Sequence, residues 1–324
     1  MASLWPTVPD LGAGLHAIER CFLRMRRAPP DLLGALCRAF AHIGAVDIDG
    51  RLADPRLRPL YAAGLAVAAA VDREVARAAE AGRAELPYHN RHHFVEATLA
   101  MGWLCAIARE RGAISLHHAV LGVVAMVGHD FRHDGSWDQT GTLERLAADA
   151  VGAIAEAAGM GAEDCQTLRG IILATALPAV RANKARAERQ PAGYRQSGLD
   201  TLHLMASEAD VLTSLMPGLG CRLGHALAEE WSARPELPPL DPASFAGRVA
   251  FLRLHDYLSD AARQFGLLRL HDSQVNALRQ LALQSGEEAE PEAGAALLDR
   301  LPPRQAARIF AAAMLRMTRE RSGL

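Results

Sequence analysis

Three separate segments of this chain carry side chains that are typical of metal-assisted chemistry. The first is Tyr88–Glu96, which contains three histidines, and the second is the adjacent pair His129 and Asp130. The third is Asp210, within a stretch of helical periodicity. Imidazole nitrogens and carboxylate oxygens suit zinc, manganese or iron, and carboxylates also suit magnesium. A lone His-Asp pair occurs by chance, so the prediction depends on all three segments together.

Two histidines and two aspartates leave coordination positions for water, which is typical of a catalytic ion. A carboxylate such as Asp130 can bridge two cations. Two cations about 3.5–4 Å apart can bind both oxygens of an in-line phosphoryl displacement and activate a hydroxide. We therefore expect a binuclear centre that hydrolyses a phosphate ester, held by His93, His129, Asp130 and Asp210.

The elements that must position these residues are predicted to be helices. Apolar residues recur at three- and four-residue spacing along nearly the whole chain, and alternating strand patterns are scarce, which predicts an all-α fold. In the first segment, His89, His93 and Glu96 are then expected on one helix face. The clearest predicted helices are Asp31–Ile43, Leu57–Ala81, Phe94–Arg111, Leu116–His129, Leu143–Ala158, Cys165–Ala176, Asp200–Leu215, Gly220–Trp231, Phe245–Phe265, Asp272–Gln284 and Arg304–Arg321.

The punctuation between helices predicts loops. Arg181–Gly198 is basic and polar, which predicts a loop, with a lid that offers arginine to an anionic substrate as the functional alternative. Gly286–Gly294 is predicted as an acidic surface loop. We expect a single catalytic domain over residues 1–324. Within it, 1–85 could form an N-terminal helical subdomain, 86–265 the metal-site core and 266–324 the C-terminal helices.

Composition narrows the class of partner and the compartment. The net charge of -2 gives no reason to expect nucleic-acid or membrane binding. Five widely spaced cysteines argue against a disulfide framework and favour the reducing cytoplasm. No apolar run reaches the ~20 residues that span a bilayer. We expect a small-molecule phosphoester as the partner, and a homodimer stays open.

The order of these segments resembles that of the HD-domain metal phosphohydrolases, and more closely the catalytic domain of the class I 3′,5′-cyclic nucleotide phosphodiesterases. That family carries Y-H-N-x-x-H-A-x-D, H-D-x-D-H-P-G, L-A-T-D, A-D and Q-x-G-F in this order. The similar stretches here are Tyr88–Glu96, His129–Gly135, Leu173–Ala176, Ala209–Asp210 and Arg248–Phe251. The resemblance runs from about Tyr88 to Phe265 and is stronger in its first half.

The resemblance implies a compact multi-helix catalytic domain that opens a 3′,5′-cyclic nucleotide to the 5′-monophosphate with a metal-bridging hydroxide. The tighter ion would be zinc, and the second, bridged by Asp130, would be magnesium or manganese. His89 would be the general acid. Glu96 would orient the region of His89, and His133 would lie near the phosphate. Glu144 is a looser candidate for a carboxylate that bonds to metal-bound water.

The departures from the family pattern fall on purine recognition. Arg248 stands where the family has the glutamine that hydrogen-bonds the purine, and an arginine has donors only. Phe251 keeps the aromatic clamp on which the base stacks, and Tyr88 is the third residue expected to bind substrate. Arg248 could instead hold a second anionic group, or be a surface residue. Arg132, Asp134 and Ala176 also differ from the family.

Three other functions stay open at this stage. The first is hydrolysis of another phosphodiester or a phosphomonoester. The second is a di-iron oxygenase, since iron is also possible at such a site, although this usually needs more protein ligands than the sequence offers. The third is a non-catalytic binding protein, against which the presence of His89 with all four ligands speaks.

Overall fold

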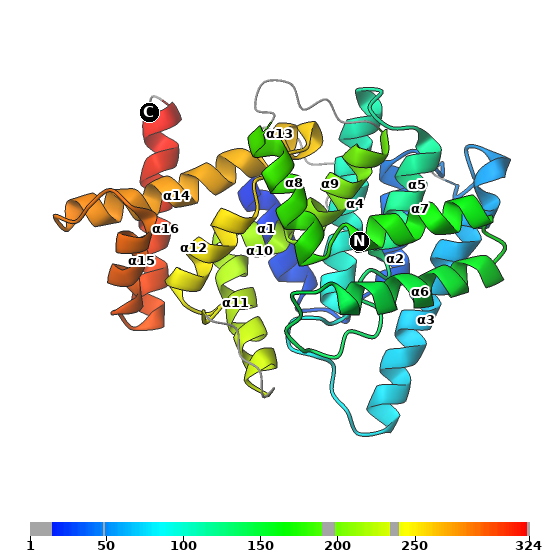
Figure 1. The fold of residues 1–324 in the computed structure, drawn as a ribbon, viewed down its shortest axis with the longest axis horizontal. Coiled ribbons are helices and arrows are strands. Elements are labelled where there is room, and N and C mark those ends of the chain that lie inside the picture. Colours follow the sequence, from blue (N-terminus) through cyan, green and yellow to red (C-terminus); the bar gives the residue numbers. More distant parts are fainter. Residues whose placement is uncertain (1–14, 48, 190–197, 234–239, 323–324) are drawn as a thin grey trace.

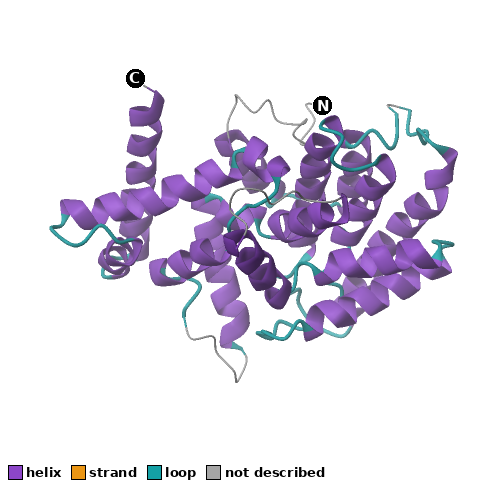
Figure 2. Ribbon diagram, turned by 45° about the horizontal axis from the view of Figure 1, so that its top comes forward, coloured by secondary structure: helices purple, strands orange, loops and turns teal. Residues whose placement is uncertain are grey.

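The computed structural model describes residues 15–47, 49–189, 198–233 and 240–322, and this part of the chain is all-helical (Figure 1, Figure 2). The predicted all-α class is confirmed, with no strand among the described residues. The elements in chain order are α1 (Leu15–Met25), α2 (Leu32–His42), the 3-10 helix η1 (Pro55–Leu57), α3 (Arg58–Glu80), α4 (Arg91–Glu110), α5 (Leu116–Met126), α6 (Thr142–Ala157), α7 (Ala162–Leu173), α8 (Leu177–Arg189), α9 (Gly198–Asp210), α10 (Leu212–Leu215), α11 (Pro217–Ser232), α12 (Phe245–Leu254), α13 (Asp260–Phe265), α14 (Leu267–Gln284), α15 (Pro291–Asp299) and α16 (Pro303–Ser322).

Two of the predicted loops are partly helical. The prediction of a loop over Arg181–Gly198 is wrong up to Arg189, because α8 is rich in alanine and arginine, which are strong helix formers. Residues 190–197 lie outside the described part. The acidic loop predicted over Gly286–Gly294 is cut short by α15, which begins at Pro291, where a proline suits the first helical position.

Two predicted helices are divided. Asp200–Leu215 forms α9 and α10, which are separated at Val211. Phe245–Phe265 forms α12 and α13 because residues 255–259 leave the helical conformation between them. Tyr257 has a φ of 49°, and Ser259 caps α13 by accepting a hydrogen bond from the Ala262 amide. The junction is tied to α8 by an ion pair, in which Lys184 Nζ lies 2.7 Å from Asp256 Oδ1.

Helix α4 lies in the centre of the molecule. Its side chains are buried without interruption from His93 to Ala108, as expected for a helix that is apolar on every side. It packs against α2, α5, α9 and α13, and α5 in turn packs against α3, α7 and α9. The helices that carry the predicted ligands are therefore the most enclosed in the fold.

The C-terminal helices α14, α15 and α16 pack on one another at the left of Figure 1, where α12 meets α15. One cluster of buried apolar side chains extends from Ile18 to Met314. None of the five cysteines forms a disulfide. Within the described ranges, no helix combines the length and the apolar character needed to cross a bilayer.

Candidate metal centre

Asn90 explains the local shape of the first segment. Its side-chain oxygen caps α4 by accepting hydrogen bonds from the amides of His92 and His93, which satisfies donors that have no partner inside the helix. The helix therefore begins at Arg91, and His89 lies in the turn before it, not on the helix face where we expected it. The two imidazoles remain neighbours, with His89 and His93 ring centroids 5.8 Å apart.

The second segment is a tight turn after α5. The predicted helix Leu116–His129 ends at Met126, and the carbonyl of Met126 accepts a hydrogen bond from His129 Nδ1 at 2.9 Å. That bond leaves Nε2 of His129 free to face the site. Gly128 allows the turn to approach its neighbours, because an added Cβ would lie 2.6 Å from a methyl of Val67 and 2.8 Å from one of Val151.

The third segment ends α9, and its last residue is Asp210. Two residues earlier, the buried carboxylate of Glu208 accepts hydrogen bonds from the amide and hydroxyl of Ser259. This link fastens the end of α9 to the start of α13. The loop after α5 and the ends of two buried helices thus position the four predicted ligands.

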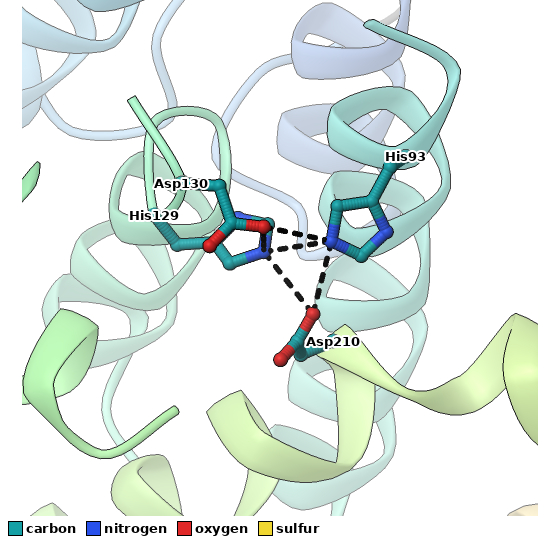
Figure 3. Close-up of side chains that lie close together, drawn as sticks. All are labelled: His93, His129, Asp130 and Asp210. Atoms are coloured by element: carbon teal, nitrogen blue, oxygen red, sulfur yellow. Dashed lines mark hydrogen bonds and ion pairs between the residues drawn. The ribbon is translucent and has the colours of Figure 1, made fainter. Parts of the chain in front are cut away.

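The four side chains converge on one point (Figure 3). His93 Nε2 lies 3.0 Å from both Asp130 Oδ2 and Asp210 Oδ1, and His129 Nε2 lies 3.2 Å from each of the same oxygens. The two Nε2 atoms are 3.1 Å apart. Four ligands about 2.0 Å from a tetrahedral ion would be separated from one another by about 3.3 Å. These residues therefore fit a divalent cation of the size of zinc.

The protonation of these groups reflects their mutual contacts. Burial alone would lower the pKa of His93, but its bonds to Asp130 and Asp210 outweigh burial and raise it to about 9. Burial would raise the pKa of the carboxyl groups of Asp130 and Asp210, but the neighbouring histidines outweigh burial and hold both pKa values well below the usual range. The donor set thus carries two carboxylate charges that a cation can neutralise in place of the histidine protons.

Beside this group, His89 is held by a residue that the sequence analysis did not single out. Its Nδ1 lies 2.5 Å from Oε1 of the buried Glu230, on α11. The other carboxylate oxygen accepts hydrogen bonds from the backbone amides of Tyr88, at 2.9 Å, and His89, at 3.1 Å. These three bonds hold Nε2 of His89 4.0 Å from Asp130 Oδ2. Burial would raise the pKa of Glu230, but its bond to His89 lowers it.

The donor atoms of His89, His133 and Glu230 also lie within 4.8 Å of one another. We do not assign a second cation to this group, because the 2.5 Å between His89 and Glu230 is a hydrogen-bond distance and is shorter than the ~3.3 Å between ligands of one ion. The signal in the sequence was available. Glu230 follows Leu223 and Leu227 on the apolar face of its helix, where a carboxylate needs a partner.

His133 stacks on His89, with ring centroids 3.6 Å apart and the planes at 18°. Burial and the neighbouring His89 lower the pKa of His133 to about 4. Its Nδ1 accepts a hydrogen bond from the Gly135 amide at 3.0 Å, which leaves Nε2 as the N–H donor of a neutral ring. His133 therefore lies where a phosphoryl oxygen could accept a hydrogen bond.

Glu144, in the first turn of α6, presents a buried oxygen, Oε2, for which no described residue provides a hydrogen bond. Burial, together with the charges of Asp130, Asp138 and Asp210, raises its pKa to about 7. Glu144 was predicted from the sequence as a looser candidate for a carboxylate that bonds to metal-bound water. Its carboxyl group is free to accept a proton from a water molecule.

Glu96 does not orient His89. Its buried carboxylate accepts two hydrogen bonds from Arg26, at 2.6 Å and 2.8 Å, and so faces α1. His89 does not share a helix face with Glu96, because α4 starts after His89. Glu230 supplies the orienting carboxylate instead, from a distant part of the chain.

The guanidinium of Arg248 is also engaged in hydrogen bonds within the protein. Its side chain is buried, and it donates hydrogen bonds to the carbonyls of Ser214 and Leu215 and to Gln274 Oε1. Burial lowers its pKa. Carbonyls at the end of a helix lack partners within it, and a guanidinium supplies several donors. The expected role of Arg248 in holding an anionic group is therefore not supported by these contacts.

We call His93, His129, Asp130 and Asp210 the metal group, since they are the candidate ligands. A cavity of about 440 Å³ opens on this group. Tyr88, His89, Asp130, His133 and Asp210 line one end, and Phe251 lines another part of the wall. The hydroxyl of Tyr88 is engaged with Ser214 Oγ at 2.9 Å. The predicted site residues thus share one cavity, apart from Glu96 and the buried ligands His93 and His129.

Comparison of the chain with protein-family models and with curated proteins gave no significant match.

Proposed function

We propose that this protein is a metal-dependent phosphohydrolase that cleaves a phosphodiester. One observation carries the proposal: two imidazole nitrogens 3.1 Å apart, each 3.0–3.2 Å from the same two carboxylate oxygens, converge next to a histidine that a buried carboxylate fixes in place. The same arrangement supports, as a proposal, a relation to the HD-domain phosphohydrolases. A divalent cation held by His93, His129, Asp130 and Asp210 would supply Lewis-acid stabilisation of the phosphoryl group and an activated water.

The residues around this group have distinct roles in the proposed reaction. His89 delivers a proton from Nε2 to the leaving oxygen, and Glu230 stabilises the protonated imidazole through Nδ1. His133 donates a hydrogen bond from Nε2 to a phosphoryl oxygen. Glu144 accepts a proton from the attacking water. Asp130 would also help to hold a second ion, and both this ion and the identity of the metals belong to the proposal.

The test is hydrolysis by the purified full chain with manganese or magnesium added. Bis(4-nitrophenyl) phosphate, cyclic AMP and cyclic GMP are the substrates, and bound metal is measured in parallel. We expect turnover of at least one diester that falls by at least about 100-fold in Asp210→Ala. Iron together with oxygen-dependent activity, or full metal loading with no diester hydrolysed, would contradict the proposal. A reducing compartment such as the cytoplasm is proposed because none of the five cysteines forms a disulfide.

A further inference from the structure

The cavity over the metal group has one largely apolar wall. On α11, Leu223, Leu227 and Trp231 follow one another at four-residue spacing and so face the cavity together. On α12, Phe251 and Leu254 do the same at three-residue spacing. A ligand whose phosphate is held at the metal end therefore places its organic group against side chains that offer dispersion and aromatic contacts.

The polar side chains on that wall are largely engaged with the protein. The hydroxyl of Ser214 pairs with Tyr88, and that of Ser244 donates to the Asp241 carbonyl and accepts from the Gly247 amide. Arg248 is held by two carbonyls and Gln274. A purine whose ring nitrogens lost water against this wall would leave them unpaired, which lowers affinity about tenfold or more.

Two nitrogen-bearing side chains of this wall stay available. The indole nitrogen of Trp231 is buried and has no hydrogen-bond partner among the described residues. The ring of His255 packs on Phe251, with centroids 4.8 Å apart. The amide of Gln139, before α6, and the guanidinium of Arg181, on α8, also line the cavity and are exposed. The α11–α12 wall thus offers single polar groups within an apolar surface.

We propose that at least one of the two groups esterified to the phosphate is apolar, an aryl or alkyl group, and that the cavity selects this group over a nucleoside. This inference rests on the proposed function and specifies its substrate class. Leu240 supports it, because this leucine lines the cavity although 46% of its side chain is exposed. Exposure of this apolar surface to water costs free energy, and an apolar ligand would cover it.

Binding can be separated from hydrolysis by using phosphonates, whose carbon–phosphorus bond is not cleaved. We would measure the affinity of the manganese-loaded full chain by calorimetry for three probes that share this head group. They are 1-naphthylmethylphosphonate, octylphosphonate and the phosphonate analogue of adenosine 5′-monophosphate. We expect at least one apolar probe to bind about tenfold more tightly than the adenosine probe. The stronger of the two apolar probes tells an aryl from an alkyl substrate.

A matched pair of exposed leucines provides the control. Leu240→Ser should weaken the better apolar probe about fivefold and leave the adenosine probe unchanged. Leu146→Ser should change neither affinity, because Leu146 is 59% exposed on α6 and does not line the cavity. Equal or tighter binding of the adenosine probe, or no binding of any probe, would overturn the inference. Selective binding with no diester hydrolysed would leave it standing and reject the proposed function instead.

Discussion

The carboxylate of Glu230 holds Nδ1 of His89 at 2.5 Å from a position 141 residues further along the chain. The same carboxylate accepts the amides of Tyr88 and His89, so backbone and ring are fixed by one side chain. This contact aligns Nε2 with the metal group without the participation of the helix α4 that carries His93. The orientation of the proposed general acid is therefore a tertiary property of the fold.

Removal of the charge on Glu230 is expected to slow catalysis with the metal in place. Glu230→Gln keeps the shape of the side chain but offers no negative charge to a protonated imidazole, so we expect kcat to fall about 100-fold. Metal content should stay equal to that of the unchanged chain. Glu229→Gln is the matched control, because the neighbouring carboxylate is exposed. A kcat unaffected by Glu230→Gln would show that this contact has no part in the reaction.

Zinc binding is expected to stabilise the folded chain. The donors are brought together only by folding, so an ion at about 100 times its Kd adds about 2.7 kcal/mol to the free energy of unfolding. Thermal unfolding of chelator-treated protein, with and without added zinc, measures this as a rise in Tm. The rise should vanish in Asp210→Ala and persist in Asp149→Ala, whose carboxylate is 80% exposed. An equal rise in both variants would place the ion elsewhere.

Glu144 is expected to weaken the metal-free protein at neutral and alkaline pH. Its pKa is about 7 in the folded chain, above the ~4.3 of an unfolded glutamate, so the folded state binds the proton more tightly. The contribution of Glu144 to the free energy of unfolding is therefore retained below about pH 4.3 and lost as the pH rises through about 7. With a chelator present, Glu144→Gln should raise Tm at pH 8 and have no effect at pH 4. A Tm unchanged at pH 8 would show that burial does not raise the pKa of Glu144. The same variant should also lose activity.

The ion pair between Arg26 and Glu96 is expected to serve stability rather than catalysis. Arg26→Met leaves the buried carboxylate of Glu96 without its partner, which should cost about 3–5 kcal/mol in the free energy of unfolding. The double variant Arg26→Met with Glu96→Gln should recover much of that loss, because the charge is gone. Denaturant unfolding gives both values. Loss of activity in the stably folded double variant would contradict this assignment.

Local patterns were sufficient for much of the helical architecture and for the four residues of the metal group. Periodicity predicts a helix such as α4 because its apolar positions are fixed by the neighbours that it must bury. The group at His93, His129, Asp130 and Asp210 could be predicted because imidazole and carboxylate in enclosed segments have few other uses.

Other features could not be predicted because they depend on distant parts of the chain. Glu230 acts on His89 across 141 residues, and no local pattern specifies that contact. The engagement of Arg248 with the end of α10 depends on how α10, α12 and α14 pack. The start of α4 was misplaced by the cap at Asn90, which shifts His89 into a turn.

The ion pair between Lys184 and Asp256 has a practical consequence. Lys184 is the only lysine of the chain, and it lies on α8, which also supplies Leu177 and Arg181 to the cavity wall. Amine-directed reagents therefore find one lysine side chain, and that side chain joins the wall of the cavity to the junction of α12 and α13. Acylation removes the charge of this amine, so a dye attached there would label a known side chain beside the cavity and break its ion pair with Asp256.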